Sequence, residues 1–178
     1  GGPLKLETKS LLRLSHLAAA LALLWGFQAA TGLSPAEKDL WRTVRSAQDH
    51  LYEWRFPSGG DNAADPWKTG LIGVEWSPTT TTLGELSAKR TACDPLWAVQ
   101  IGRWFDEAGL KPGDRVAILA SSSFPGLVLS SIAAAEARSL ESLLVVSLGA
   151  STWGANSPDH PWPVIERELR QGGFVRAK

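Results

Sequence analysis

The stretch that decides the fold reads Arg115-Val116-Ala117-Ile118-Leu119-Ala120 and runs directly into Ser121-Ser122-Ser123-Phe124-Pro125. A short apolar run next to turn residues is typical of a buried strand, and a hydroxyl-rich segment that ends in proline predicts a loop before a helix. Residues 71–76, which lead into 77–82, and residues 143–148, which lead into 149–156, have the same form. We therefore predict three strands, each followed by a hydroxyl-rich loop.

Apolar residues at helical spacing fill the intervals between these runs. The predicted helices run from Ser34-Pro35-Ala36-Glu37, a capping box, to just before Pro57; from Asp94-Pro95 to Gly109; from Ser123, as N-cap, past Ala135; and from Pro163 to Gln171. This alternation predicts an α/β fold, with a mostly parallel sheet and flanking helices in a Rossmann-like three-layer arrangement. The apolar second and third strands favour burial on both faces. Phe174-Val175 predicts the opening of a further strand.

The N-terminal segment has no charged side chain from Leu14 to Ala36. A helix that crosses a bilayer needs about 20 mostly apolar residues, which this run just reaches. Lys5, Lys9 and Arg13 precede it and predict an inside N-terminus. We expect a single-pass transmembrane or anchor helix at the cell membrane, with the α/β domain on the outer side. A signal peptide and an Ala-rich core helix are the alternatives.

Three regions follow from these patterns. We expect residues 1–33 to form the hydrophobic anchor, with Gly1-Gly2 as a candidate tag scar, and residues 34–66 to form the capped helix and a linker. Residues 67–178 form the α/β domain, which we expect to be truncated at its C-terminus because the last predicted strand has barely begun.

Composition narrows the choice of partners. Lys and Arg number 18 and Asp and Glu number 18, so no basic surface predicts nucleic acid binding. Cys93 is the single cysteine, and His16, His50 and His160 lie far apart, so we predict no metal site. No Gly-x-Gly-x-x-Gly or phosphate-loop pattern occurs, so we predict no nucleotide and no other cofactor.

The candidate site follows from strand direction, because the carboxyl ends of parallel strands meet at one edge of a sheet. Hydroxyls and helix N-termini there suit a carboxylate or phosphate, and glycines allow close approach of the backbone. If Glu75 were buried, Lys89 or Arg90 would be its partner; otherwise it faces water. Serines that cap a helix and a purely structural loop are the alternatives. The candidate ligand-binding residues are Glu75, Ser77, Thr79, Thr80, Arg90, Ser121, Ser122, Ser123, Gly149, Ser151, Thr152, Asn156 and Asp159.

Catalysis is harder to predict from these residues. A nucleophilic serine needs a base within reach, and the Gly-x-Ser-x-Gly elbow is absent. Asp159 and His160 are adjacent in sequence, which is not the geometry of a triad. No catalytic residue is therefore predicted.

Four stretches resemble, in order, the poly-gamma-glutamate system protein family: residues 71–84, 88–91, 121–125 and 148–159. The resemblance covers roughly residues 70 to 175. It implies a membrane-associated accessory protein of poly-gamma-glutamate synthesis or export, which binds the anionic polymer or the synthase membrane complex through its hydroxyl-rich loops. An enzyme that hydrolyses or transfers γ-glutamyl amide bonds is the alternative.

Overall fold

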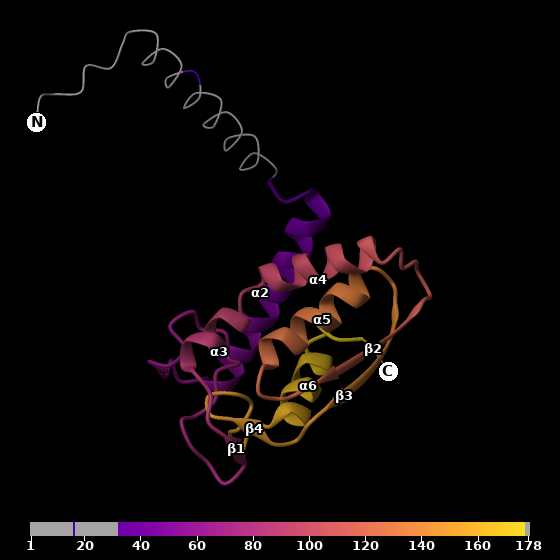
Figure 1. The fold of residues 1–178 in the computed structure, drawn as a ribbon. Helices are drawn as coiled ribbons and strands as arrows, with labels where there is room; N and C mark the ends of the chain where they lie inside the picture. The colour runs from indigo at the N-terminus through magenta and orange to yellow at the C-terminus, as the bar shows by residue number, and fades with distance from the viewer. Residues whose placement is uncertain (1–15, 17–31, 177–178) are drawn as a thin grey trace, which may run out of the picture. The chain divides into compact units, whose positions relative to one another are not determined.

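The computed structural model describes residue 16 and residues 32–176. The chain divides into two units, 1–35 and 36–178, and the fold described here is that of the second. It is a mixed α/β fold with parallel strands, as predicted (Figure 1). The elements are α2 (Pro35–Arg55), β1 (Thr80–Thr82), α3 (Leu86–Ala92), α4 (Leu96–Glu107), β2 (Arg115–Ala120), α5 (Pro125–Ala137), β3 (Glu141–Val146), β4 (Ala150–Ser151) and α6 (Trp162–Gln171).

The decisive stretch forms a β-α-β unit. Strands β2 and β3 are parallel and pair in register from Arg115 opposite Glu141 to Ala120 opposite Val146. Helix α5 connects them and packs on the pair, between it and α4 (Figure 1). Strands β1 and β4 form a second parallel pair. The described residues therefore hold two two-stranded sheets where the sequence predicted one.

The predicted strand at residues 71–76 is wrong. Leu71 and Ile72 are buried in the core, but Val74, Glu75 and Trp76 all face solvent, so the alternation of a strand is lost. The backbone of this segment bonds to Trp153 at two points only, from Gly73 N at 3.1 Å and to Val74 O at 2.9 Å. Apolar content placed the segment in the core without giving it a ladder of hydrogen bonds.

Smaller differences lie at other element ends. Helix α3 was not predicted, and β3 begins two residues before the predicted run. Phe174-Val175 is not a strand, because the N–H groups of both residues bond back to Leu169 O at the end of α6. The other helices begin and end within a few residues of the predicted positions, and a proline or glycine follows the end of each except α5.

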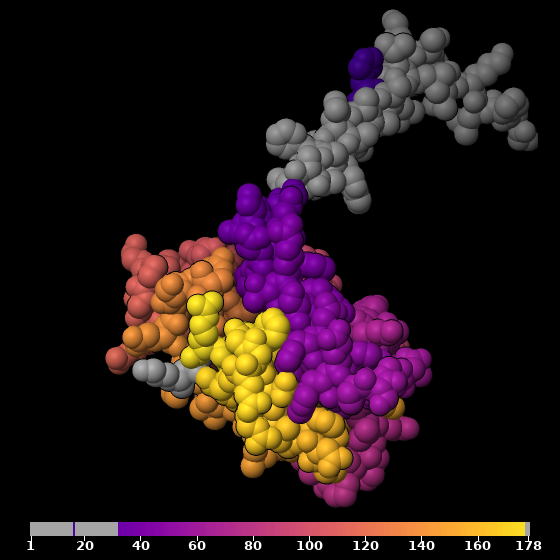
Figure 2. Space-filling view, turned by 180° about the vertical axis from the view of Figure 1, so that it is seen from behind, coloured from indigo at the N-terminus to yellow at the C-terminus, as the bar shows by residue number. Residues whose placement is uncertain are grey.

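One hydrophobic core joins the helices. Helix α2 contributes Leu40, Val44, Ala47 and Leu51 at helical spacing, and α6 contributes Ile165 and Leu169. These two helices also meet at the surface, where His50 Nε2 lies 2.7 Å from Glu168 Oε1 and the ring of His50 lies 5.3 Å from that of Phe174. Figure 2 shows the C-terminal segment lying along the segment that contains α2.

Among the described residues, the β2–β3 pair is covered on one face only, so the structure does not show the predicted burial on both faces. Residues alternate between half-buried and exposed along both strands. The inner set packs toward α5 and the core, whereas Leu119, Leu143 and Val145 of the outer set face solvent. In the part of the chain that the structure describes, no helix lies over these outer side chains.

The predicted anchor lies almost wholly outside the described residues. Among residue 16 and residues 32–176, no helix is long and apolar enough to cross a bilayer.

Gly126→Ala tests the close contact between α5 and α3. A Cβ at this position would lie 2.8 Å from Cys93 Cα and closer still to the carbonyl oxygen of Ala92. Overpacking against backbone costs about 1–3 kcal/mol, and alanine offsets up to about 1 kcal/mol of this as the better helix former. We therefore expect a net loss of up to about 2 kcal/mol in unfolding free energy. Urea denaturation measures it. Gly60→Ala, which meets only ordinary contacts, is the control; equal losses in both variants would contradict the packing argument.

Candidate functional site

The hydroxyl-rich loops after residue 76, after β2 and after β3 meet one another through side-chain hydrogen bonds. They meet beside the two parallel strand pairs, and two of the loops themselves contain β1 and β4. Most of the hydroxyls that the sequence placed at a ligand site are buried and bond to a neighbouring loop. The candidate site is therefore a cluster of loops held together by side-chain hydrogen bonds.

Asn156 is the centre of the first half of this cluster. Its side chain is fully buried, and its Oδ1 accepts from Val74 N at 3.0 Å. Its Nδ2 donates to Val74 O at 2.8 Å and to Thr80 Oγ1 at 2.9 Å. The backbone oxygen of Asn156 accepts hydrogen bonds from the hydroxyls of Ser77 and Thr79. One amide side chain therefore replaces a missing strand pairing.

Serines hold the second half. Ser122 Oγ donates to Gly149 O at 2.8 Å, and Ser123 Oγ accepts from Ser151 N at 2.9 Å. The sequence predicted Ser123 as the N-cap of α5, but the N-cap is Phe124, whose side chain makes no capping hydrogen bond. The hydroxyl of Ser123 bonds to a neighbouring loop instead.

Glycines allow these loops to approach one another. A Cβ at Gly154 would lie 2.8 Å from Ser123 Cα, and one at Gly149 would overlap the methyl group of Thr81. The glycines predicted to admit a ligand thus admit a neighbouring loop.

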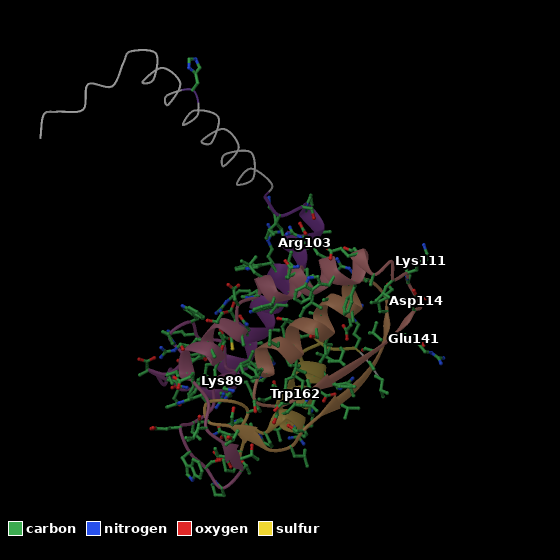
Figure 3. The ribbon with its side chains drawn as sticks, in the orientation of Figure 1. Lys89, Arg103, Lys111, Asp114, Glu141 and Trp162 are labelled. Carbon is green, nitrogen blue, oxygen red and sulfur yellow. The ribbon has the colours of Figure 1, made fainter. Side chains whose placement is uncertain are left out.

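Lys89, on α3, is the residue that the site prediction missed. Its side chain is only 3% exposed, and Nζ donates to Ser123 O at 2.7 Å and to Ser151 Oγ at 2.6 Å. The ammonium also lies 3.7 Å from the centroid of the Phe124 ring. Burial lowers the pKa of Lys89 by disfavouring its charged form. Figure 3 shows Lys89 beside the β1 and β4 segments.

The sequence around Lys89 gives little indication that Lys89, and not its neighbour Arg90, belongs to the site. Arg90 follows it directly and points elsewhere, with Nε donating to Ala64 O at 2.8 Å and Nη2 to Ala63 O at 3.1 Å. Neither cation pairs with Glu75, which is exposed, so the alternative of a carboxylate that faces water applies. A reliable boundary for α3 would have placed Lys89 on its inner face.

Other predicted residues lie at the margin of the cluster. Thr152 Oγ1 exchanges hydrogen bonds with Gly84, accepting from N at 2.7 Å and donating to O at 2.8 Å. Ser121 is exposed and donates to Ser123 Oγ at 2.9 Å. Asp159 is exposed, and no hydrogen bond among residues 32–176 connects it to the cluster.

A hollow of about 690 Å³ lies elsewhere, between α2 and the segment 57–68. None of the predicted site residues lines it. Arg45 lines it and is already engaged by Asp49 and by the carbonyl of Trp67 at 2.9 Å. Within the described residues, no group of three or more His, Cys, Asp or Glu side chains is placed to hold a metal ion.

Comparison with protein-family models, with curated proteins and with solved structures finds no match for this chain.

Asn156→Ala tests whether the cluster depends on one side chain. The substitution leaves the N–H of Val74 without its partner. It also removes one of the bonds to Val74 O and one of those to Thr80 Oγ1, which keep the bonds from Trp153 N and Ser77 N. We expect a loss of about 2–4 kcal/mol in unfolding free energy. Asn62→Ala removes a single bond, from Ala64 N at 3.0 Å, and is the matched control, with an expected loss below about 1 kcal/mol. Similar losses in both variants would show that the cluster does not depend on the Asn156 side chain.

Proposed function

We propose that this protein is an accessory subunit of a poly-gamma-glutamate synthesis or export system. One observation carries the proposal: the stretches that resemble the family, residues 71–84, 88–91, 121–125 and 148–159, are the ones that bond to one another. Asn156 joins the last stretch to the first, and Lys89 joins the second to the third and fourth. A motif whose parts are distant in sequence and interlocked in space supports a shared architecture better than scattered likeness does.

The surface outside this cluster favours a protein partner over the polymer. Trp76 is 66% exposed and Leu83 is 79% exposed, on either side of β1. Glu75 beside them is exposed and would repel a chain of carboxylates. Trp is enriched at binding hot spots, and exposed apolar side chains that lie together mark interaction sites. The proposed partner is therefore the synthase membrane complex, contacted by Val74, Glu75, Trp76 and Leu83.

The remaining parts of the proposal concern location and architecture. A membrane anchor near the N-terminus would hold the α/β unit on the outer side, next to a membrane-bound synthase. The β2–β3 and β1–β4 pairs would then be the parallel strands of a Rossmann-like arrangement in which, among the described residues, helices cover one face of β2–β3. The parallel β-α-β unit around α5 supports this interpretation.

Trp76→Ala tests the proposed contact surface. In cells that produce the polymer, we expect the variant to lose at least about 90% of its co-purification with the synthase complex, because truncating a hot-spot aromatic costs 2 kcal/mol or more. Polymer output should fall with it. Trp104→Ala, which removes an exposed Trp from α4, is the control and should leave both unchanged. Retention of the complex by Trp76→Ala would contradict the proposed contact.

A second candidate function is hydrolysis or transfer of γ-glutamyl amide bonds, and the Lys89–Ser151 contact favours it. Burial makes Lys89 give up its proton more readily than an exposed lysine does, and in its neutral form Nζ could act as the base for a serine nucleophile. Lys89 would take the Ser151 hydroxyl proton as Oγ attacks the amide carbonyl, giving an ester, and return the proton to the departing amine. Water, or an acceptor amine in transfer, would then cleave the ester. Both side chains are buried, so substrate access requires the loops to open.

Ser151→Ala separates the two candidates. If the protein is an enzyme, purified protein should shorten poly-gamma-glutamate, and Ser151→Ala should reduce the rate by at least about 10³-fold, as expected for loss of a nucleophile. Ser87→Ala, which changes an exposed serine of α3 outside the candidate site, should retain activity. Absence of shortening by the unmodified protein, measured by polymer chain length, would eliminate the enzymatic candidate and leave the accessory role.

A further inference from the structure

The outer face of the β2–β3 pair is an apolar surface that is exposed in the described part of the chain. Leu119 is 75% exposed, Leu143 is 65% exposed and Val145 is 51% exposed, and Leu148, just past β3, is 70% exposed. Parallel sheets are normally covered on both faces, because their strands are apolar on both. Contiguous exposed apolar side chains of this kind mark interaction sites.

The charged side chains at one end of this face indicate the charge pattern that a partner surface would need. Arg115 and Glu141 open the two strands on the same outer face, and Arg115 Nε lies 3.2 Å from Glu141 Oε2. Figure 3 shows Glu141 at the same end of the pair as Lys111 and Asp114, which belong to the turn that leads into β2. The face therefore has one positive and one negative group side by side at its edge, followed by aliphatic side chains.

We propose that this face binds the same face of a second copy of the chain, forming a twofold dimer. The register of the strands supports it. A twofold axis that runs along the strands, midway between them, lays β2 of each copy over β3 of the other without shifting either along its length. Since Arg115 is level with Glu141 and Leu119 is level with Val145, opposite charges meet and aliphatic side chains meet.

Side-chain size is also complementary in this arrangement. Ala117 is level with Leu143, so the small residue of each copy lies opposite the large residue of the other. Two sheets that pack face to face with nearly aligned strands interdigitate in this way. A partner protein of arbitrary sequence would need no such match of charge and size between β2 and β3.

The mass of the full chain in detergent, measured by light scattering at increasing concentration, tests the dimer. We expect a dimer for the unmodified protein, and Leu143→Glu should weaken its association by at least about tenfold by placing a carboxylate in the apolar centre. Leu96→Glu changes an exposed leucine at the start of α4 and should leave the dimer intact. A monomer at all concentrations, or equal effects of the two variants, would overturn the proposal.

Charge reversal tests the orientation of the axis. Arg115→Glu alone places two carboxylates opposite each other twice in the dimer, and Glu141→Arg alone places two cations opposite each other twice, so each variant should be monomeric. An equimolar mixture of the two restores both opposite-charge pairs. With different affinity tags, the variants should therefore co-purify with each other but not with copies of themselves. Equal self-association and cross-association would overturn the arrangement, and circular dichroism of each variant checks that the fold is retained.

Discussion

Side-chain hydrogen bonds hold the part of this fold where the backbone ladder is too short to do so. Strand β1 has three residues and β4 has two, so their pairing fixes little by itself. Asn156, Ser122, Ser123 and Lys89 supply the missing bonds between loops. Each bond contributes only about 0.5–1.5 kcal/mol when made, but a buried polar group left without a partner costs about 1–3 kcal/mol. The cluster is therefore stable when all of its bonds are made, and the loss of one bonding partner costs more than that bond contributes.

Elements with regular apolar spacing could be predicted from the sequence, whereas irregular segments and short elements could not. The β2-α5-β3 unit combines compact apolar runs with a long apolar helix, and prolines or glycines mark the ends of most helices, so local signals sufficed. Residues 71–76 carried the same apolar signal, yet only Leu71 and Ile72 enter the core, because Gly73 and Val74 are held by a tertiary contact with Trp153. Helix α3 is only seven residues long, so its apolar residues do not repeat over enough turns to predict a helix.

The candidate site shows the limit of composition more sharply. The hydroxyls expected to gather do gather, but Ser122, Ser123 and Thr152 are buried and bond to neighbouring loops. A serine that binds a ligand and a serine that binds an adjacent backbone are identical in sequence, since both need only a donor or acceptor nearby. Burial decides between them. Lys89 makes the same point in reverse, because a lysine is expected at the surface until its helix is known to face inward.

The network and the proposed contact surface are physically connected. Trp76 and Leu83 flank β1, and the loop between them is fixed through Ser77, Thr79 and Thr80 to Asn156. A binding surface whose backbone is already ordered loses less conformational entropy when it binds, so more of the contact energy remains as affinity. Buried hydroxyls that touch no partner would thereby strengthen binding by the exposed side chains beside them. The outer face of β2–β3 needs no such support, because the paired strands and α5 already fix its side chains in register.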